Sequence, residues 1–340
     1  MINSGQLDQL FKDFRSINAL VIGDVMVDAY LYGKVDRISP EAPVPVVSLA
    51  RRVNMLGGAA NVALNIKALG ATPLLFSVIG EDLKGKEFLD MMHREDIGSE
   101  GIISSPERIT TTKFRIIGNN NHMLRVDEES VNSLSEQLES HLLEIIRQTM
   151  LKQKVHVIVF QDYDKGVITK NLIQGVMALA AENSIPVAVD PKRRNFATYR
   201  GVKLFKPNLK ELREGMKADF PVSDKDALHE SIAMLQERAK HEIVMVTLSD
   251  EGIIARFKTN GRHMVHSQPA FVRTISDVSG AGDTVISVAS ICVALDVNPP
   301  LMAFLANLAG GIVCEYVGVV PIDIKRLKRE AIEFVGKTQE

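Results

Sequence analysis

The sequence contains no tryptophan, only two cysteines and few aromatic residues, 5% of 340. Cys292 and Cys314 lie in apolar stretches and belong to no metal-spaced cluster, which excludes a disulfide scaffold and a zinc module. The formal net charge of -2 offers no basic surface for nucleic acid or membranes. Residues 1–8 lack the features of a signal peptide, and the longest apolar run, residues 285–295, is too short to span a bilayer. We therefore expect a cytoplasmic protein that binds neither nucleic acid nor membrane.

The composition, 46% hydrophobic and 24% charged, is typical of a globular protein. Short apolar runs alternate with segments of helical periodicity, which predicts an α/β fold with a mostly parallel central sheet in a single domain, residues 1–340. Strands are expected at residues 19–23, 74–79, 155–160, 186–189, 202–205 and 243–247, and helices at residues 8–14, 134–152, 168–182 and 225–239.

A glycine-rich stretch, residues 277–284, precedes the longest apolar run. Gly280, Ala281 and Gly282 allow a tight turn into a helix, where unpaired N–H groups and the helix dipole form an anion site. Asp283 places a carboxylate in the first turn of that helix. An anion site beside a base suits transfer of a phosphoryl group to a hydroxyl. The alternative is an ordinary loop in which Asp283 only favours the helix N-terminus.

Polar residues gather after each predicted strand. In open α/β sheets ligands bind at the carboxyl ends of the strands, so this repeated placement predicts one site at one sheet edge. The first strand is expected to end in a polar loop, whose Asp24 and Asp28 are either substrate ligands or plain turn residues. The residues of this group after later strands are Asp162, Lys165, Asp190, Lys192, Asn208, Glu211 and Thr247.

Several of these residues have two readings. Gly57 and Gly58 precede Asn61 at a second helix start, which either approaches a sugar or packs tightly on the sheet. Asn208 and Glu211 share one face of a helical turn, where they either hold Mg²⁺ through water or form a capping box. Lys165 and Lys192 either meet phosphate or are solvated, and Asn307 either bonds a nucleotide or is a core amide.

A second, smaller sheet is expected outside this alternation. Three prolines within residues 37–47 exclude a helix and a central strand, and favour an edge strand at residues 44–53. Two more strands, residues 110–117 and 123–127, flank a turn signal at residues 118–121. We interpret these strands, within about residues 34–55 and 108–128, as a lid over the site; the alternative is an extension of the main sheet.

Two motifs together, residues 57–61 and 277–283, resemble the ribokinase family of PfkB-type carbohydrate kinases over about residues 15–320. The resemblance implies a ribokinase-like sheet with a β lid, ATP and Mg²⁺ as requirements, and Asp283 as the catalytic base beside an anion hole of Gly280, Ala281 and Gly282. A monovalent cation is left open. It implies ATP contacts at Asn208, Leu209, Lys210, Glu211, Thr247, Gly252 and Asn307, with Glu211 holding Mg²⁺ through water, and sugar contacts at Asp24, Asp28, Gly57, Gly58 and Asn61. Ser249 and Val278 depart from the usual pattern.

A narrower resemblance, carried by residues 37–46, 112–115, 125–127, 162–166 and 190–192, is to kinases that phosphorylate the anomeric oxygen of D-glycero-β-D-manno-heptose 7-phosphate for lipopolysaccharide core synthesis. Such kinases are often fused to a nucleotidyltransferase; we expect the kinase domain alone here. A phosphorylated substrate needs cationic partners. The candidates are Lys165, Lys192, Arg115 and Arg37, and Asp190 is a further expected substrate contact. The family also implies a homodimer joined through the lid strands.

Two other functions stay open. Another kinase of the family, acting on ribose, fructose or a nucleoside, is disfavoured by residues 37–47. A sugar-binding regulator without catalysis is disfavoured by the presence of Asp283, Asn208 and Glu211. A nicotinamide dehydrogenase is excluded because no predicted strand is followed by G-x-G-x-x-G.

Overall fold

A nine-stranded sheet forms the centre of the computed structural model, which describes residues 3–119 and 121–337. Its strands are β1 (Asn18–Gly23), β4 (Thr72–Gly80), β5 (Ile102–Ser105), β8 (Val157–Gln161), β9 (Val187–Asp190), β10 (Leu204–Phe205), β11 (Ile243–Thr247), β12 (Ile253–Thr259) and β13 (Arg262–Gln268). Their order is β13-β12-β11-β10-β9-β8-β1-β4-β5, and every neighbouring pair from β11 to β5 is parallel. The predicted mostly parallel α/β sheet is confirmed.

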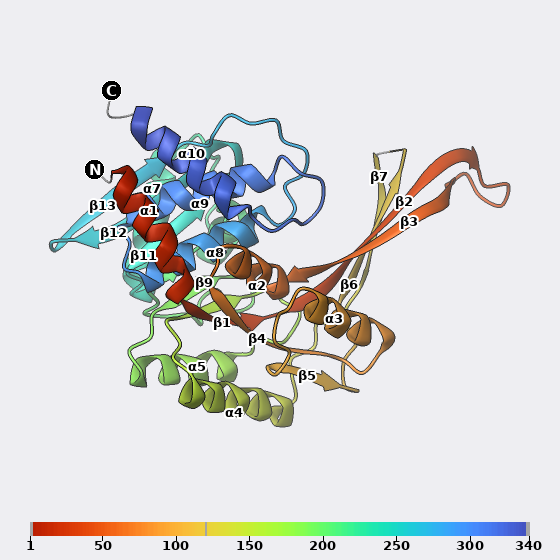
Figure 1. Ribbon diagram of the computed structural model, residues 1–340, viewed down its shortest axis with the longest axis horizontal. Coiled ribbons are helices and arrows are strands. Elements are labelled where there is room, and N and C mark those ends of the chain that lie inside the picture. The colour runs from red at the N-terminus through yellow and green to blue at the C-terminus, as the bar shows by residue number, and fades with distance from the viewer. Residues whose placement is uncertain (1–2, 120, 338–340) are drawn as a thin grey trace.

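Helices cover both faces of this sheet (Figure 1). They are α1 (Ser4–Asp13), α2 (Ala59–Ala68), α3 (Leu83–Arg94), α4 (Glu136–Lys152), α5 (Lys170–Glu182), α6 (Leu209–Met216), α7 (Lys225–Ala239), α8 (Ala281–Ala294), α9 (Pro299–Val313) and α10 (Ile324–Lys337). Alternate side chains of β1 point to opposite faces. Ala19 and Val21 pack with α1, α2, α8 and α9, whereas Leu20 and Ile22 pack with α4, α5 and α7. The core therefore has two layers, one on each side of the sheet.

Helix α8 follows the glycine-rich stretch, as predicted. It begins at Ala281 after Gly280, whose φ of 80° lies in the left-handed region that glycine adopts without strain. The helix is apolar nearly all round and packs against α2 and α9, which buries it. In the described part of the chain, no helix is long and apolar enough to cross a membrane.

The expected second sheet is present and separate from the main one. It has the order β3-β2-β6-β7, formed by β2 (Val25–Ile38), β3 (Pro45–Gly58), β6 (Thr112–Gly118) and β7 (Asn121–Glu128). This small sheet projects from the body at the end opposite β12 and β13 (Figure 1). Pro45 opens β3, an edge strand, where a missing N–H is tolerated. The predicted turn at residues 118–121 includes Asn120, which lies outside the described residues.

One sequence expectation about strands was wrong, and one hairpin was missed. The polar loop expected after Gly23 is only Asp24, because the alternating apolar residues Val25, Val27 and Ala29 start β2 at once and bury one of its faces. The hairpin of β12 and β13 was not predicted. Its signal was the turn Asn260-Gly261, whose φ angles of 49° and 77° suit a tight hairpin between two antiparallel strands.

Candidate active site

The carboxylate of Asp283 accepts hydrogen bonds from three side chains that come from distant parts of the chain. Asn61 Nδ2 donates to its Oδ2 over 2.7 Å, while Tyr163 Oη and Gln161 Nε2 donate to its Oδ1 over 2.7 and 3.1 Å. Asp283 is 4% exposed, and this burial raises its pKa to about 6, against the hydrogen bonds from Asn61 and Tyr163 that lower it. A buried carboxylate that titrates near neutrality has the properties of a general base.

The start of α2 brings Asn61 to Asp283. The preceding glycines lie against two aspartates: a Cβ on Gly57 would come 2.1 Å from Asp28 Oδ2, and one on Gly58 would come 2.3 Å from the Asp24 carbonyl oxygen. Gly58 also has a φ of 62°. Residues with side chains would force this junction apart. These glycines therefore allow the close packing of β3 on β2, and their contact with a sugar stays a prediction.

Asn65 fixes α2 against α8, one turn after Asn61. Its Nδ2 donates to the carbonyl oxygen of Asn61 over 2.9 Å, and its Oδ1 accepts the Thr284 hydroxyl over 3.0 Å. The same Oδ1 accepts the N–H of Ile322. All of these groups are buried, so the network holds the two helix starts in one register.

An ion pair of two buried residues lies next to this carboxylate. Lys206 Nζ lies 2.9 Å from Asp190 Oδ2, and Lys206 is only 2% exposed. Gln161 Nε2 is 3.3 Å from the same Asp190 oxygen, so one amide contacts both Asp190 and Asp283. The charge of Lys206 acts to lower the pKa of Asp283, whereas that of Asp190 acts to raise it.

Asn208 and Glu211 form a capping box at the start of α6. Asn208 Oδ1 accepts the Glu211 N–H over 2.9 Å, and Glu211 Oε2 accepts the Asn208 N–H over 2.8 Å. Glu211 Oε1 pairs with Lys192. Although burial acts to lower it, Asp190 and Glu211 raise the pKa of Lys192. The capping box is thus present in the structure. Lys192 is a partly buried partner of carboxylates rather than a fully solvated lysine.

The residues expected to contact ATP lie at two places. Asn208 and Thr247 are joined by a parallel β-bridge, next to Leu209 and the exposed Lys210. Gly252 and Asn307 meet the segment 268–270. A Cβ on Gly252 would come 2.1 Å from the Gln268 carbonyl oxygen, and Asn307 Nδ2 donates to the Pro269 carbonyl oxygen over 2.7 Å.

The cations expected to meet a substrate phosphate already have partners, with one exception. Arg115 pairs with Asp28, and Lys165 Nζ lies 2.7 Å from Glu129 Oε1. Arg37 is exposed near the far end of β2. Burial raises the pKa of Asp28, against the charge of Arg115.

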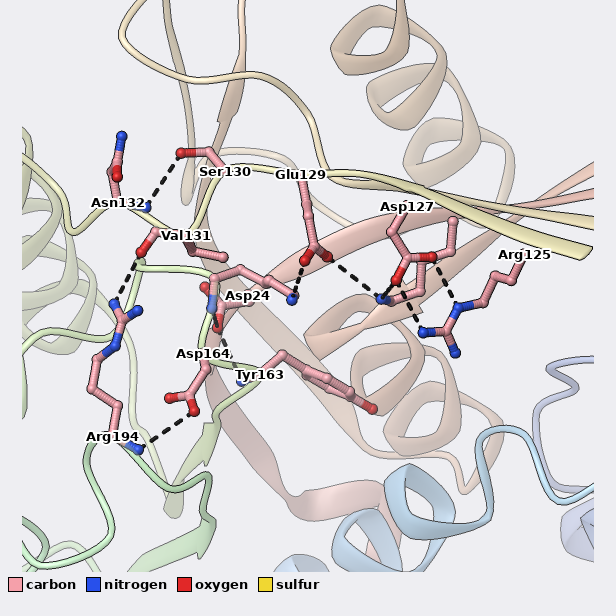
Figure 2. Close-up of polar contacts among 12 residues, drawn as sticks. Asp24, Arg125, Asp127, Glu129, Ser130, Val131, Asn132, Tyr163, Asp164 and Arg194 are labelled. Carbon is pink, nitrogen blue, oxygen red and sulfur yellow. Dashed lines mark hydrogen bonds and ion pairs between the residues drawn. The ribbon is translucent and has the colours of Figure 1, made fainter.

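A chain of alternating charges links β7 to the loop after β8 (Figure 2). Arg125 contacts Asp127 over 2.9 Å, Asp127 contacts Lys113 over 3.2 Å, and Lys113 lies 3.7 Å from Glu129. Glu129 then reaches Lys165. Side-chain ion pairs therefore connect the small sheet to the loop after β8, in addition to the backbone between them.

Asp24 holds the loop that carries Tyr163. Its carboxylate accepts the N–H groups of Tyr163, Lys165 and Val167 over 2.9, 3.1 and 2.9 Å. Burial raises the pKa of Asp24, while these N–H donors act to lower it. Asp24 thus contacts main chain after β8 and is 1% exposed.

A cavity of about 730 Å³ lies elsewhere, at the amino ends of β10 and β11. Lys203, His241 and Ile243 are among the residues that line it, and none of the predicted site residues does. The predicted residues instead meet at the carboxyl ends of the strands, as expected for an open α/β sheet.

Comparison with known proteins identifies the family. The model of the "pfkB family carbohydrate kinase" matches residues 16–325. The chain belongs to the PfkB family. It is thus a carbohydrate kinase by family, that is, a phosphotransferase.

Curated relatives are similar in sequence to this chain over most of the chain's length. It is 37% identical over 312 residues to the "Bifunctional protein HldE" of Geobacter metallireducens and 39% identical over 313 residues to that of Methylobacillus flagellatus. Each match covers 92% of this chain and 62% of the relative, so the chain spans less than two thirds of those proteins.

Solved structures of PfkB kinases share the fold. Phosphofructokinase-2 from Escherichia coli in complex with potassium is 16% identical, with a TM-score of 0.76 over 94% of this chain and 99% of its own. Arabidopsis thaliana ribokinase complexed with ribose and ATP is 15% identical, with a TM-score of 0.70 over 92% and 99%. The ribokinase-like fold expected from the two motifs is confirmed.

Three residues of this cluster were missed from the sequence. Gln161 is the last residue of β8, Tyr163 lies two residues later, and Lys206 follows β10 directly. Their position after strands was the available signal. Glutamine and tyrosine carry no charge, so the sequence alone does not distinguish them from ordinary residues at the end of a strand.

Proposed function

We propose that this protein transfers the γ-phosphoryl group of ATP to the anomeric hydroxyl of D-glycero-β-D-manno-heptose 7-phosphate, giving the 1,7-bisphosphate used for lipopolysaccharide core synthesis. The observation that carries the proposal is Asp283, buried in the first turn of α8, beside the N–H groups of that turn and with a pKa of about 6. The relatives named HldE support a heptose as the acceptor.

The mechanism follows from the chemistry of this turn. Asp283 takes the proton of the acceptor hydroxyl as the sugar oxygen bonds to the γ-phosphorus and the bond from that phosphorus to ADP breaks. The N–H groups of Gly280, Ala281 and Gly282 and the positive end of the α8 dipole would stabilise negative charge on the moving group. The Ala281 N–H donates to the Val278 carbonyl oxygen over 3.3 Å, a bond that the phosphoryl oxygen would share or replace. Removing Asp283 therefore removes the proton acceptor but leaves the anion site in place.

The donors around Glu211 fit Mg²⁺. Among the described residues no group of three or more His, Cys, Asp or Glu side chains is placed to hold a metal ion, which excludes an all-protein cage in that part of the chain. Mg²⁺ needs only one or two carboxylates plus water and phosphate oxygens. The oxygens of Glu211 and Asn208 accept the capping hydrogen bonds, and each keeps a second lone pair for a water on the ion. When bound with ATP, Mg²⁺ neutralises phosphate charge. Thr247, Gly252 and Asn307 would hold the nucleotide.

The proposed sugar phosphate would enter between the main sheet and the small sheet. Arg115 and Lys165 lie on this side with Asp28, and each is paired with one carboxylate. An added phosphate would share these cations with their carboxylates, as charge-assisted networks allow. Asn61, Gly57 and Gly58 border the same region beside Asp283.

We further propose a homodimer joined through the small sheet. Its strands β3 and β7 are edges with unpaired backbone groups. Large apolar side chains on these strands are exposed, among them Leu49 at 60% and Leu124 at 57%. Sedimentation at micromolar concentration measures the state, and a monomer there would contradict the dimer.

The reaction is tested with ATP, Mg²⁺ and a panel of acceptors, with the new phosphate located by NMR. The panel holds heptose 7-phosphate, ribose, fructose and a nucleoside. Turnover of ribose or fructose but not of heptose 7-phosphate would identify another kinase of the family. A failure to turn over any acceptor would favour a sugar-binding regulator.

The role of Asp283 is tested in the same assay. Asp283→Ala should lower kcat by at least ~10²-fold, because a general base contributes about that much. Ser290→Ala is the matched control, since Ser290 is equally buried on α8 and bonds only its own helix, at the Ile286 carbonyl oxygen. Near-normal turnover by Asp283→Ala would remove Asp283 from its role.

A further inference from the structure

The carboxylate of Asp283 already receives a hydroxyl from the protein itself. Tyr163 Oη lies 2.7 Å from Asp283 Oδ1. A general base needs the hydroxyl it deprotonates at about 2.6–3.2 Å, so the phenol stands at the distance of an acceptor. The other two donors, from Asn61 and Gln161, are amides. Among these three donors, only Tyr163 has the chemical form of the group that the reaction would place there.

The ring of Tyr163 also reaches the opposite half of the proposed site. Its centroid lies 5.4 Å from Lys192 Nζ, and Lys192 pairs with Glu211, the carboxylate proposed to organise Mg²⁺ and phosphates. One side chain therefore contacts both the proposed base and the proposed phosphate end. The Tyr163 side chain thus adjoins both of the groups between which the phosphoryl group would move.

The main chain of Tyr163 is held by Asp24, whereas its hydroxyl is held by Asp283. Asp24 holds the N–H groups of Tyr163 and Lys165, and Glu129 holds the Lys165 side chain. Figure 2 shows the Tyr163 ring extending away from Asp24. The residue is only partly buried, in contrast to Asp283. Displacing the hydroxyl from Asp283 therefore breaks none of the hydrogen bonds that hold the main chain of this loop.

We propose that Tyr163 is a plug that the sugar displaces: its hydroxyl occupies the acceptor position on Asp283 until the hydroxyl of the sugar takes that position. The inference rests on the proposed function, because it requires Asp283 as the base. The plug keeps water from the same position. Without the phenol, a water molecule could take this position. The water oxygen would bond to the γ-phosphorus, a water proton would pass to Asp283, and the bond from the phosphorus to ADP would break, so that ATP is hydrolysed without phosphorylation of a sugar.

Two variants of the full chain test this with ATP and Mg²⁺. Tyr163→Ala removes the ring, and ATP hydrolysis without sugar should rise about tenfold or more, the scale of one hydrogen bond to a charged group. Tyr163→Phe removes only the competing hydroxyl. At pH 9, where Asp283 stays ionised even without this hydrogen bond, KM for the sugar should fall about tenfold with kcat maintained. The control is Tyr316→Phe. The Tyr316 hydroxyl accepts from Arg326 over 3.1 Å on the surface, so that variant should behave as wild type.

Tyrosine emission provides a readout that does not depend on turnover. The chain has five tyrosines and no tryptophan, so tyrosine emission is not masked. A phenol hydrogen-bonded to a carboxylate is quenched, and its displacement by a sugar should increase emission. The increase should be present in wild type and in Tyr316→Phe, and absent in Tyr163→Phe.

The outcomes separate this inference from the proposed function. One result would overturn the plug: kcat falls in both Tyr163 variants, while KM and ATP hydrolysis without sugar stay unchanged. It would show that the phenol stays on Asp283 during the reaction. If no sugar is phosphorylated but Tyr163→Ala still raises ATP hydrolysis, the plug stands and the proposed acceptor is wrong. Thermal melting of each variant checks that it is folded.

Discussion

Replacing Asn61 by alanine should move the acidic limb of the kinase's pH profile. In wild type that limb should lie near pH 6, because the base must be ionised and the pKa of Asp283 is raised to about 6 by burial. Activity should therefore rise as the pH rises through this value. Asn61 contributes to that balance, since its N–H stabilises the charged carboxylate across 2.7 Å.

The size of the shift follows from the lost hydrogen bond. A hydrogen bond to a charged group contributes about 1.5–3 kcal/mol. One pH unit corresponds to about 1.4 kcal/mol, so Asn61→Ala should displace the limb upward by about 1–2 units. Wild type at pH 7 keeps roughly nine tenths of Asp283 ionised, whereas the variant would keep between about half and a tenth. Its kcat/KM at pH 7 should fall accordingly and recover by about pH 9.

The assay is kcat/KM measured from pH 5 to 9 with saturating ATP and Mg²⁺. Ser290→Ala, which alters an equally buried side chain two turns along α8, should keep the limb of wild type. A limb that stays in place in Asn61→Ala, with activity lowered equally at every pH, would refute the reasoning. It would mean that Asn61 acts on the substrate and not on the ionisation of Asp283.

Three predictions concern stability, measured by urea denaturation. Gly280→Ala should lower the free energy of unfolding by about 1–3 kcal/mol, because φ is 80° and the added Cβ would lie 2.9 Å from Asn61 Nδ2. Gly282→Ala is the control, since its added Cβ would lie 4.0 Å from the nearest atom, and this variant should fold normally. Lys206→Met should lower the free energy of unfolding by about 3–5 kcal/mol, because it leaves the buried charge of Asp190 without its ion-pair partner. A smaller loss would show that water reaches Asp190. Burial lowers the pKa of His241 to about 4, so the folded state binds fewer protons between that pH and 6.5, and acid favours unfolding. His241→Phe should therefore gain about 2 kcal/mol at pH 5 relative to pH 8, and an equal effect at both values would contradict this.

Much of the candidate site could be predicted because its chemistry is local. Gly280 and Asp283 are close in sequence to the helix that they begin, and the capping box of Asn208 and Glu211 spans three residues. The choice between the two interpretations of a residue such as Lys192 could not be made from its neighbours in the sequence. Whether Lys192 is solvated or paired depends on Glu211, which lies 19 positions away.

The sequence by itself determined the α/β sheet, the helix that starts at the glycine-rich turn, and the separate small sheet, because periodicity, glycine and proline act on the backbone nearby. The tertiary structure alone decided which groups surround Asp283. Asn61 is 222 positions away from it and Tyr163 is 120 positions away. Such contacts arise from the packing of α2, β8 and α8, and so does the burial that raises the pKa of Asp283, since desolvation depends on everything that packs around a carboxylate.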